Sequence, residues 1–242
     1  HYLKHTLVRR NVIQGTIAAT GLWVDHSNHN SRITANLVTG ANGSAFFLEA
    51  TYGPTLIDHN VFWGSRGPGV LLTDSSSATI ANNLIGCCAG PPVRIAKPHA
   101  RIIDVETQRK ASTENNRVVG NVFYGFETRG PELPREDGNS SDFNVFINPA
   151  DAKSFDMATW QKQTGSETHS QTATAILEFS AADWRLRGTI PALESPRVSV
   201  VTADFLGIAR RGATSDAGPF VHQGLKSEIT LFTGNVSAAK SP

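Results

Sequence analysis

The sequence NVIQG at Asn11–Gly15 returns as NLVTG at Asn36–Gly40 and as NVFWG at Asn60–Gly64. A shortened copy, NLIG, begins at Asn83, and a further full copy, NVFYG, spans Asn121–Gly125. The first four asparagines are 25, 24 and 23 residues apart, and a period in the low twenties indicates a solenoid. Equivalent residues of successive coils then lie one above another, so chemistry can be sought along the columns of the stack.

The content of one repeat indicates which solenoid this is. Leucine-rich repeats share the period, but they need a Leu-x-x-Leu-x-Leu frame that this chain lacks. Each repeat instead holds short apolar runs bounded by Gly, Asn and Ser, such as Gly21–Val24, Arg32–Thr34 and Asn36–Val38. Three strands in a coil of about 24 residues predict an all-β fold, a right-handed parallel β-helix. The repeated asparagines are expected to stack as an internal ladder of side-chain amides.

The period holds to residue 92, and we expect residues 1–150 to form the coils that carry the site. Residues 151–242 are expected to add the last coil, a short capping helix and a C-terminal tail of the same domain, because a solenoid needs its open core covered. The segments expected after the regular part are a strand at 93–95, a polar excursion at 97–116, strands at 117–124 and 142–148, a helix from an N-cap at Ser154 to about Gln163, and a last coil strand at 183–186.

Composition excludes several classes of function. Lys+Arg 22 against Asp+Glu 21 leaves the chain near neutral and without a basic stripe, so we expect no nucleic-acid partner. No apolar run approaches the roughly 18 residues of a membrane span, so we expect no membrane partner. Cys87 and Cys88 are adjacent, which suits neither an ordinary disulfide nor a metal site. We therefore expect no metal and no cofactor, while the cellular compartment and homo-oligomerisation stay open.

Alternation along the strands predicts a column of outward polar side chains. If Leu22 and Val24 point into the coil, Trp23 and Asp25 point outward, since successive side chains of a strand alternate between faces. The same phasing one coil later places Phe47 and Glu49 outward, and one coil further places Thr73 outward. Asp25, Glu49 and Thr73 are 24 residues apart in turn and should therefore form one column.

Two stacked carboxylates are the most informative feature of this column. Neighbouring strands lie about 4.7–4.9 Å apart, and retaining glycosidases separate their two carboxyl groups by about 5–5.5 Å. A single outward carboxylate is usually just solvated, but two in register repel each other, and one must hold a proton to act as an acid. We expect Glu49, beside Phe47, to be the acid/base and Asp25, beside His26, to be the ionised nucleophile.

The stretches GLWVD at Gly21–Asp25 and FFLEATYGP at Phe46–Pro54 resemble the catalytic segments of glycoside hydrolase family 120. Its members are parallel β-helix β-xylosidases, and the resemblance implies an Asp25 nucleophile and a Glu49 acid/base. The similarity extends through Pro98-His99 and the tail around 204–220. The family has upstream coils and an inserted β-sandwich, so the chain resembles the C-terminal part of a member, and we expect coils before His1. An aromatic residue and a histidine of the family are replaced by His26 and Tyr52.

These observations predict a retaining exo-glycosidase, β-xylosidase-like, that acts on a xylose-containing oligosaccharide. Because sugar faces stack on aromatic rings and sugar hydroxyls bond to polar side chains, the expected substrate-binding residues are Trp23, His26, Phe47, Tyr52, Thr73, Arg94 and His99.

Two other functions stay open for such a solenoid. A polysaccharide lyase needs Ca²⁺ or a basic cluster to neutralise a uronate, together with a Lys or Arg base. The outward column shows no aligned Lys or Arg, which disfavours this chemistry. The second alternative is a non-catalytic carbohydrate-binding β-solenoid, for which the fold serves equally well.

Overall fold

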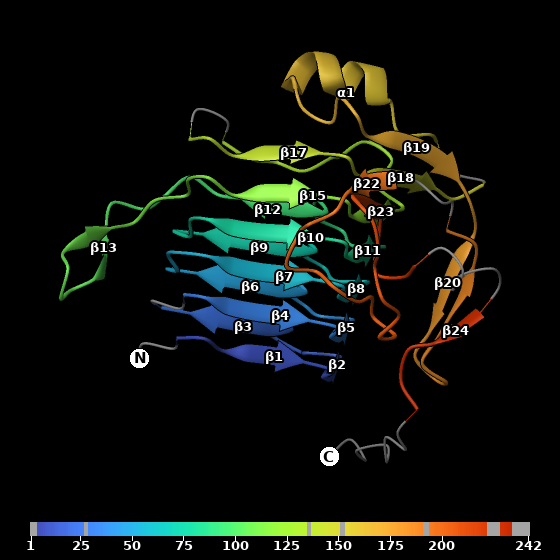
Figure 1. Ribbon diagram of the computed structural model, residues 1–242, viewed down its shortest axis with the longest axis horizontal. Helices are drawn as coiled ribbons and strands as arrows, with labels where there is room; N and C mark the ends of the chain where they lie inside the picture. The colour runs from blue at the N-terminus through green and yellow to red at the C-terminus, as the bar shows by residue number, and fades with distance from the viewer. Residues whose placement is uncertain are drawn as a thin grey trace.

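The computed structural model describes residues 4–26, 29–134, 137–150, 153–190, 194–221 and 228–233. It shows the expected right-handed parallel β-helix, built from three sheets that run along the axis of the coil (Figure 1). The 4-stranded sheet consists of β3 (Leu22–Asp25), β6 (Phe46–Glu49), β9 (Val70–Thr73) and β12 (Val93–Ile95). The 6-stranded sheet consists of β1 (Leu7–Arg9), β4 (Ser31–Thr34), β7 (Thr55–Asp58), β10 (Ala78–Ala81), β15 (Arg117–Val119) and β17 (Ser140–Asp142).

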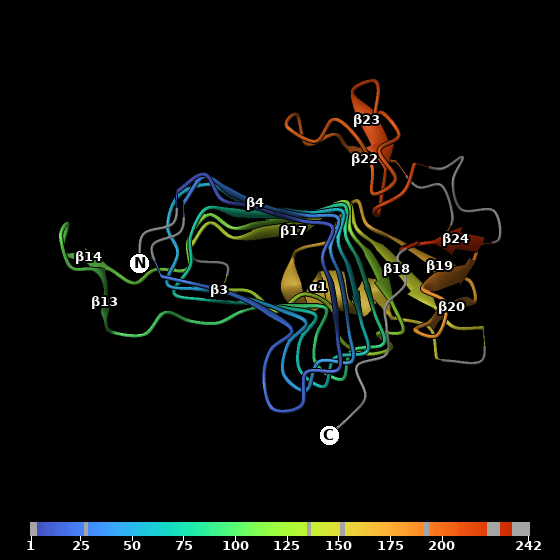
Figure 2. The ribbon, with the colours of Figure 1, turned by 90° about the horizontal axis from the view of Figure 1, so that it is seen from below.

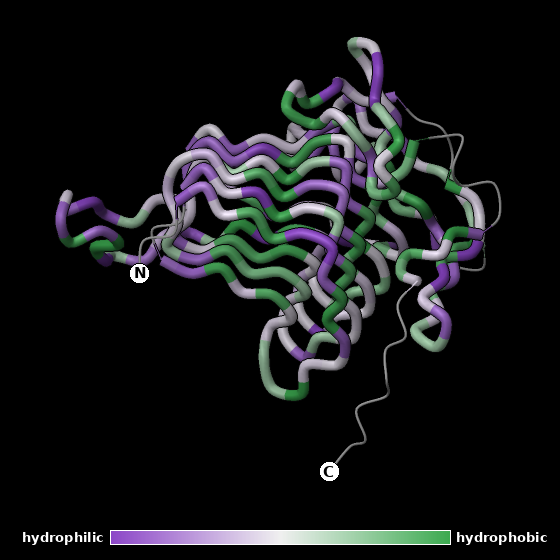
Figure 3. The backbone as a smooth tube through the Cα atoms, turned by 60° about the horizontal axis from the view of Figure 1, so that its bottom comes forward, coloured by the Kyte–Doolittle hydropathy of each residue, from purple (hydrophilic) through white to green (hydrophobic). Residues whose placement is uncertain are grey.

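The 7-stranded sheet completes the coil and extends furthest along its axis. Its strands are β2 (Val12–Gln14), β5 (Leu37–Thr39), β8 (Val61–Trp63), β11 (Leu84–Gly86), β16 (Val122–Tyr124), β18 (Val145–Asn148) and β19 (Gln171–Thr174). Every strand pair within the three sheets is parallel. Figure 3 shows that apolar residues follow the stacked strands from coil to coil.

Aromatic side chains fill much of the interior. Phe46 stacks on Phe62 with ring centroids 6.0 Å apart, and Phe123 meets Phe146 edge to face at 5.1 Å. All four are fully buried. The predicted alternation is confirmed along β3 and β6, because the residues expected inward are more buried than their outward neighbours. On β9 it fails at Thr73, which was expected to face outward as a substrate-binding residue but is buried.

The predicted asparagine ladder is present. The side-chain amide nitrogen of each ladder residue donates to the side-chain oxygen of the next at 2.8–3.1 Å, through Asn11, Asn36, Asn60, Asn83, Asn121 and Asn144. The same oxygen also accepts the backbone N–H of the preceding ladder residue. Five of the six are almost fully buried, so the ladder satisfies polar groups that water cannot reach.

The helix α1 (Met157–Thr164) lies over the C-terminal end of the coil, as expected for a cap (Figure 1). Phe155, just before it, stacks on Phe146 of the core at 4.4 Å. The predicted N-cap at Ser154 is wrong: Asp156 caps the helix by accepting the backbone N–H of Thr159 at 3.0 Å. A carboxylate directly before the helix satisfies one of its open N–H groups, which Ser154 lies too far upstream to reach.

Three predicted strands differ from the structure. The segments 117–124 and 142–148 are each interrupted by a corner, since Gly120 and Phe143 adopt left-handed backbone angles that end a strand. The segment 183–186 does not form a coil strand. It overlaps β21 (Arg185–Gly188), which pairs antiparallel with β20 (Leu177–Ser180) and β24 (Glu228–Thr230).

The C-terminal segment packs on the side of the coil rather than over its open end (Figure 2). The antiparallel sheet of β20, β21 and β24 contributes Leu177, Leu186 and Ile229 to an apolar cluster on the outer face of the 7-stranded sheet. A further antiparallel pair, β22 (Glu194–Pro196) and β23 (Thr214–Asp216), contacts a corner of the coil, where the Asn82 side-chain amide donates to the backbone oxygen of Asp216 at 3.1 Å. Within the described residues, no helix has both the length and the apolar character needed to cross a membrane.

A buried polar network fastens the C-terminal segment to the coil. His59 donates from Nδ1 to Asp58 at 2.7 Å and accepts at Nε2 from the Arg210 guanidinium at 2.9 Å. Asp58 and His59 are fully buried, and Arg210 is only 3% exposed. Arg32 adds two further bonds to the Asp58 carboxylate. Burial lowers the pKa of His59, although Asp58 acts in the opposite direction, so the imidazole is held neutral.

Removal of one internal ladder residue should destabilise the fold. In Asn60→Ala the backbone and side-chain N–H groups of Asn36 lose their acceptor in a dry interior, so we expect the free energy of unfolding to fall by about 2–4 kcal/mol. The matched control is Asn11→Ala at the exposed end of the ladder, which should cost less than about 1 kcal/mol. Urea denaturation measures both, and equal losses in the two variants would contradict a stabilising role for the buried ladder.

Stability should also fall below neutral pH because of His59. Its pKa is lowered from 6.5 in the native state, so the unfolded chain takes up a proton below about pH 6.5 while the native chain does not. The free energy of unfolding should therefore decrease between pH 7 and 5, by at most about 1.4 kcal/mol per pH unit from this group. Urea denaturation across this range should give a shallower slope for His59→Gln and an unchanged slope for His5→Gln on the surface. A slope in His59→Gln as steep as the parent's would refute the assignment.

Candidate functional site

The predicted carboxylate column is present on the outer face of the 4-stranded sheet. Asp25 is in register with Glu49, and Glu49 is in register with Thr73. The Asp25 side chain is 42% exposed and that of Glu49 is 17% exposed, whereas Thr73 is buried. Because adjacent parallel strands lie about 4.8 Å apart, the two acids project from neighbouring rungs of one ladder.

An aromatic platform runs beside the column. The rings of Trp23 and Phe47 stack with centroids 5.6 Å apart and planes inclined by 16°. On the next two strands of the sheet, the residues in register with Phe47 are Leu71 and then Arg94. Trp23 is 56% exposed, an unusual position for so large an apolar side chain, and the platform therefore offers a flat apolar surface next to the two acids.

His26 is tied to the first acid. Its backbone N–H donates to Asp25 Oδ1 at 2.7 Å, and its ring Nδ1 lies 2.9 Å from the same oxygen. A left-handed backbone, with φ of 50°, turns the chain immediately after β3 and brings the ring back to the carboxylate. His26 thus lies directly against the first acid.

The second acid has a partner that the sequence did not reveal. Arg101 donates from Nη2 to Glu49 Oε1 at 2.6 Å and from Nε to Asp74 Oδ2 at 2.5 Å. The column itself contains no aligned Lys or Arg, as predicted, but this arginine reaches it from outside the repeat. Arg101 is 52 residues from Glu49 and comes from the excursion that breaks the repeat period, so periodicity alone could not place it. The polar insertion at 97–116 was the only sign that something projects beside the coil.

The excursion forms a hairpin of β13 (Ile102–Asp104) and β14 (Arg109–Lys110) that projects from the coil (Figure 1). The Tyr52 hydroxyl donates to Asp104 Oδ2 at 2.5 Å, and the Arg109 guanidinium lies 4.4 Å above the Tyr52 ring. The Tyr52 hydrogen bond is the main cause that lowers the pKa of Asp104 to about 2. Tyr52 therefore points at the hairpin and helps to hold it beside Glu49.

The other predicted residues lie at the margin of this arrangement. His99 bonds to Asp74 through its backbone N–H at 2.7 Å and approaches the same carboxylate with Nδ1 at 3.0 Å. Arg94 pairs with Glu132 at 2.7 Å, and both line a shallow depression of about 500 Å³. His99 is thus next to the partner of Arg101, while Arg94 lies two rungs from Phe47 along the platform.

No group of three or more His, Cys, Asp or Glu side chains that could hold a metal occurs in the part of the chain that the structure describes. Cys87 and Cys88 are both free thiols, the first exposed and the second buried. The reactive groups at the column are the carboxylates of Asp25 and Glu49, the Arg101 guanidinium and the His26 imidazole.

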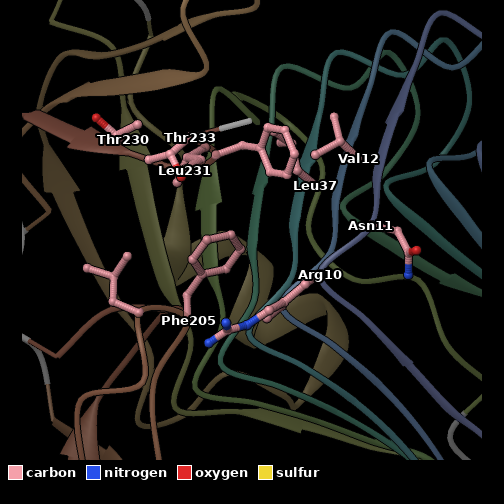
Figure 4. A pocket seen from close by; sticks show the side chains of 11 residues that line it. Arg10, Asn11, Val12, Leu37, Phe205, Thr230, Leu231 and Thr233 are labelled. Carbon is pink, nitrogen blue, oxygen red and sulfur yellow. The ribbon is translucent and has the colours of Figure 1, made fainter. Parts of the chain in front are cut away.

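A second cavity, of about 320 Å³, lies on a different face (Figure 4). It opens between the outer surface of the 7-stranded sheet and the C-terminal segment, and its walls come from Arg10, Asn11, Val12, Ala35, Leu37, Phe205, Leu206 and Thr230–Thr233. The lining residues that the structure describes are mainly apolar and include no acid or histidine. Residue chemistry thus favours the carboxylate column over this more enclosed space as the reactive site.

Comparisons with known proteins agree with the architecture. The family model described as "Right handed beta helix region" matches residues 2–132. A solved structure, the complex of XylC with xylose, is similar with a TM-score of 0.55 at 15% sequence identity. The likeness covers 94% of this chain and 43% of XylC, so the chain spans less than half of that protein's length. At this identity the likeness is one of fold, and no curated protein matches the sequence.

Loss of the Tyr52 hydroxyl should change the titration of its partner. In Tyr52→Phe the pKa of Asp104 should rise from about 2 toward 3.8, staying below it because the backbone N–H groups of Glu106 and Thr107 still bond to the carboxylate. Carbon-detected NMR titration of the aspartate carboxyl resonances measures this, with Tyr124→Phe, remote from Asp104, as the control. An unchanged Asp104 midpoint in Tyr52→Phe would refute the contact.

Proposed function

Because the chain belongs to the family of right-handed β-helix proteins, we propose that its 4-stranded sheet carries a carbohydrate site and that it is a retaining glycosidase of the β-xylosidase type. The observation that carries this proposal is the register of Asp25 with Glu49 on adjacent parallel strands. A rung spacing of about 4.8 Å matches the separation of about 5–5.5 Å between the two carboxyl groups of retaining enzymes. An inverting enzyme would need about 6.5–9.5 Å, enough to admit a water molecule.

In the proposed reaction, Asp25 attacks the anomeric carbon while protonated Glu49 gives its proton to the departing glycosidic oxygen. A covalent glycosyl-enzyme and a free alcohol result. Glu49, now a carboxylate, then takes a proton from water as the water oxygen displaces Asp25, and the sugar leaves with its original anomeric configuration. Arg101 bonds to Oε1 of Glu49, so in the proposed reaction the transferred proton belongs to Oε2, and Oε1 keeps its hydrogen bond throughout.

The proposed substrate is an oligosaccharide that ends in xylose. The stacked rings of Trp23 and Phe47 offer the flat apolar surface on which a sugar face packs. His26, bonded to the proposed nucleophile, and Tyr52, held against the hairpin, are suited to contact ring hydroxyls. The resemblance of the catalytic segments, and the xylose bound by the structurally similar XylC, support a pentose over other sugars.

The presence of Arg101 beside the column is a feature that a polysaccharide lyase would also need, because an arginine can serve as the base that removes a proton beside a uronate carboxyl. Its contacts argue against that role. Burial alone lowers the pKa of Arg101, but the hydrogen bonds to Glu49 and Asp74 outweigh it and raise the pKa. A guanidinium held charged between two carboxylates is a poor base. Glycoside hydrolysis therefore fits the site better than β-elimination.

The test is hydrolysis of a panel of nitrophenyl glycosides, led by the β-xyloside and the α-arabinoside. We expect the parent protein to release nitrophenol and Asp25→Asn to lose at least about 10³-fold in kcat, because no nucleophile remains. Glu178→Gln, a surface acid on β20, serves as the matched control and should keep parental activity. NMR of the first product should show the anomer of the substrate.

Each contrary result has a distinct meaning for this proposal. Full activity in Asp25→Asn would remove Asp25 as nucleophile, and an inverted product would exclude double displacement. Release of an ultraviolet-absorbing unsaturated uronate from acidic polysaccharides, with no glycoside cleaved, would establish a lyase instead. Calorimetric binding of xylo-oligosaccharides without turnover would establish a non-catalytic carbohydrate-binding solenoid.

A further inference from the structure

Arg101 occupies a bridging position between two acids of different burial. It is 35% exposed, whereas the Glu49 side chain is 17% exposed and Asp74 is fully buried. Both of its contacts, at 2.6 Å and 2.5 Å, are short charge-assisted hydrogen bonds. Such bonds are about twice as strong as neutral ones and fix direction as well as distance.

Asp74 is a fixed anchor for this arginine. Besides the guanidinium, its carboxylate accepts the backbone N–H of His99 and approaches the His99 ring. Burial alone raises the pKa of Asp74, but the hydrogen bonds from His99 and Arg101 outweigh it and lower the pKa below the ordinary value. A buried, charged acid with several donors has little freedom to move, so Arg101 is held at Nε while Nη2 reaches Glu49.

The hairpin also holds the backbone of this arginine, because the backbone N–H of Ala111 donates to the carbonyl of Arg101 at 2.9 Å. Arg101 leads directly into β13, and the tip of that strand is bonded to Tyr52, three residues beyond Glu49. Arg109 of β14 covers the Tyr52 ring. The excursion that forms the hairpin therefore makes two side-chain hydrogen bonds to the same coil, one to Glu49 and one to Tyr52.

We propose that Arg101 is the positioning residue of the site: anchored on Asp74, it fixes the Glu49 carboxylate one rung from Asp25, and the hairpin assembles the pair. This inference rests on the proposed glycosidase function. Glu49 has three rotatable bonds and must serve first as acid and then as base at the same oxygen position. A guanidinium that stays bonded to Oε1 keeps the other oxygen of Glu49 in that position in both steps.

The experiment compares Arg101→Gln and Arg101→Lys with Lys110→Gln. The last is the matched control, because Lys110 is an exposed cation of the same hairpin that has no part in the proposed site. We expect Arg101→Gln to lower kcat by about 10²-fold while KM stays within about 3-fold, since misplacement by about 1 Å costs that much. Arg101→Lys should recover part of the loss, and Lys110→Gln should keep kcat within about 3-fold of the parent.

Parental kcat in Arg101→Gln, or a rise in KM with kcat unchanged, would overturn the proposal. Because Arg101→Gln leaves the buried charge of Asp74 without its main partner, it can fail to fold. The double variant Asp74→Asn with Arg101→Gln removes that charge and then carries the test, with the same expected loss in kcat.

Crystal structures separate this inference from the proposed function. If the parent hydrolyses no glycoside, the proposed function fails, and the position of Glu49 in the parent, Arg101→Gln and Lys110→Gln crystals still tests the positioning role. A Glu49 carboxylate that is displaced or adopts several rotamers only in Arg101→Gln supports it. A Glu49 carboxylate that keeps the parental position in Arg101→Gln refutes it.

Discussion

The structure depends on one repeated interaction, the side-chain hydrogen bond between asparagines of successive coils. Each link fixes how far one coil is rotated and shifted relative to the next. Side chains alternate with a period of two, so a slip by one residue would move every outward group of a strand into the core. The register of Asp25 with Glu49, and the stacking of Trp23 on Phe47, are consequences of this alignment.

The ladder also explains how an insertion can enter the coil without disrupting it. Asn83 and Asn121 are 38 residues apart, yet their bond at 3.0 Å is equivalent to those between residues 23 or 24 apart. The additional chain leaves the coil after β12 and returns before β15, and its hairpin lies outside the stack. The buried ladder fixes only the register of the coil strands. The loops between them can therefore vary in length and carry side chains such as Arg101 to the outer surface of the coil.

Periodicity was sufficient to predict what the ladder controls. The strand columns, the inward and outward alternation, the asparagine ladder and the pairing of Asp25 with Glu49 all follow from a repeat of about 24 residues. Contacts made by non-repeating segments could not be predicted, because nothing in the sequence relates Arg101 to Glu49 or Arg210 to His59, 151 residues away. The C-terminal strands pack on the side of the coil because the outer face of the 7-stranded sheet is apolar there, at Trp63, Leu84 and Val122. These residues belong to the repeat motif, and the sequence pattern does not distinguish them from other apolar strand residues.

Charge balance around the two acids connects the fold to the proposed chemistry. Stacked carboxylates repel, and the buried charge of Asp74 just after β9 adds to the same field. A neutral residue at one of these positions would lessen the repulsion and leave the sheet intact, because its strands are paired through backbone groups and not through these side chains. The chain instead keeps all three acids and offsets them with one guanidinium brought from an insertion. Stacked like charges are an unfavourable arrangement, and such arrangements are kept mainly where function requires them. The pairing of Asp25 with Glu49 therefore supports a reactive pair of carboxylates over two ordinary solvated side chains.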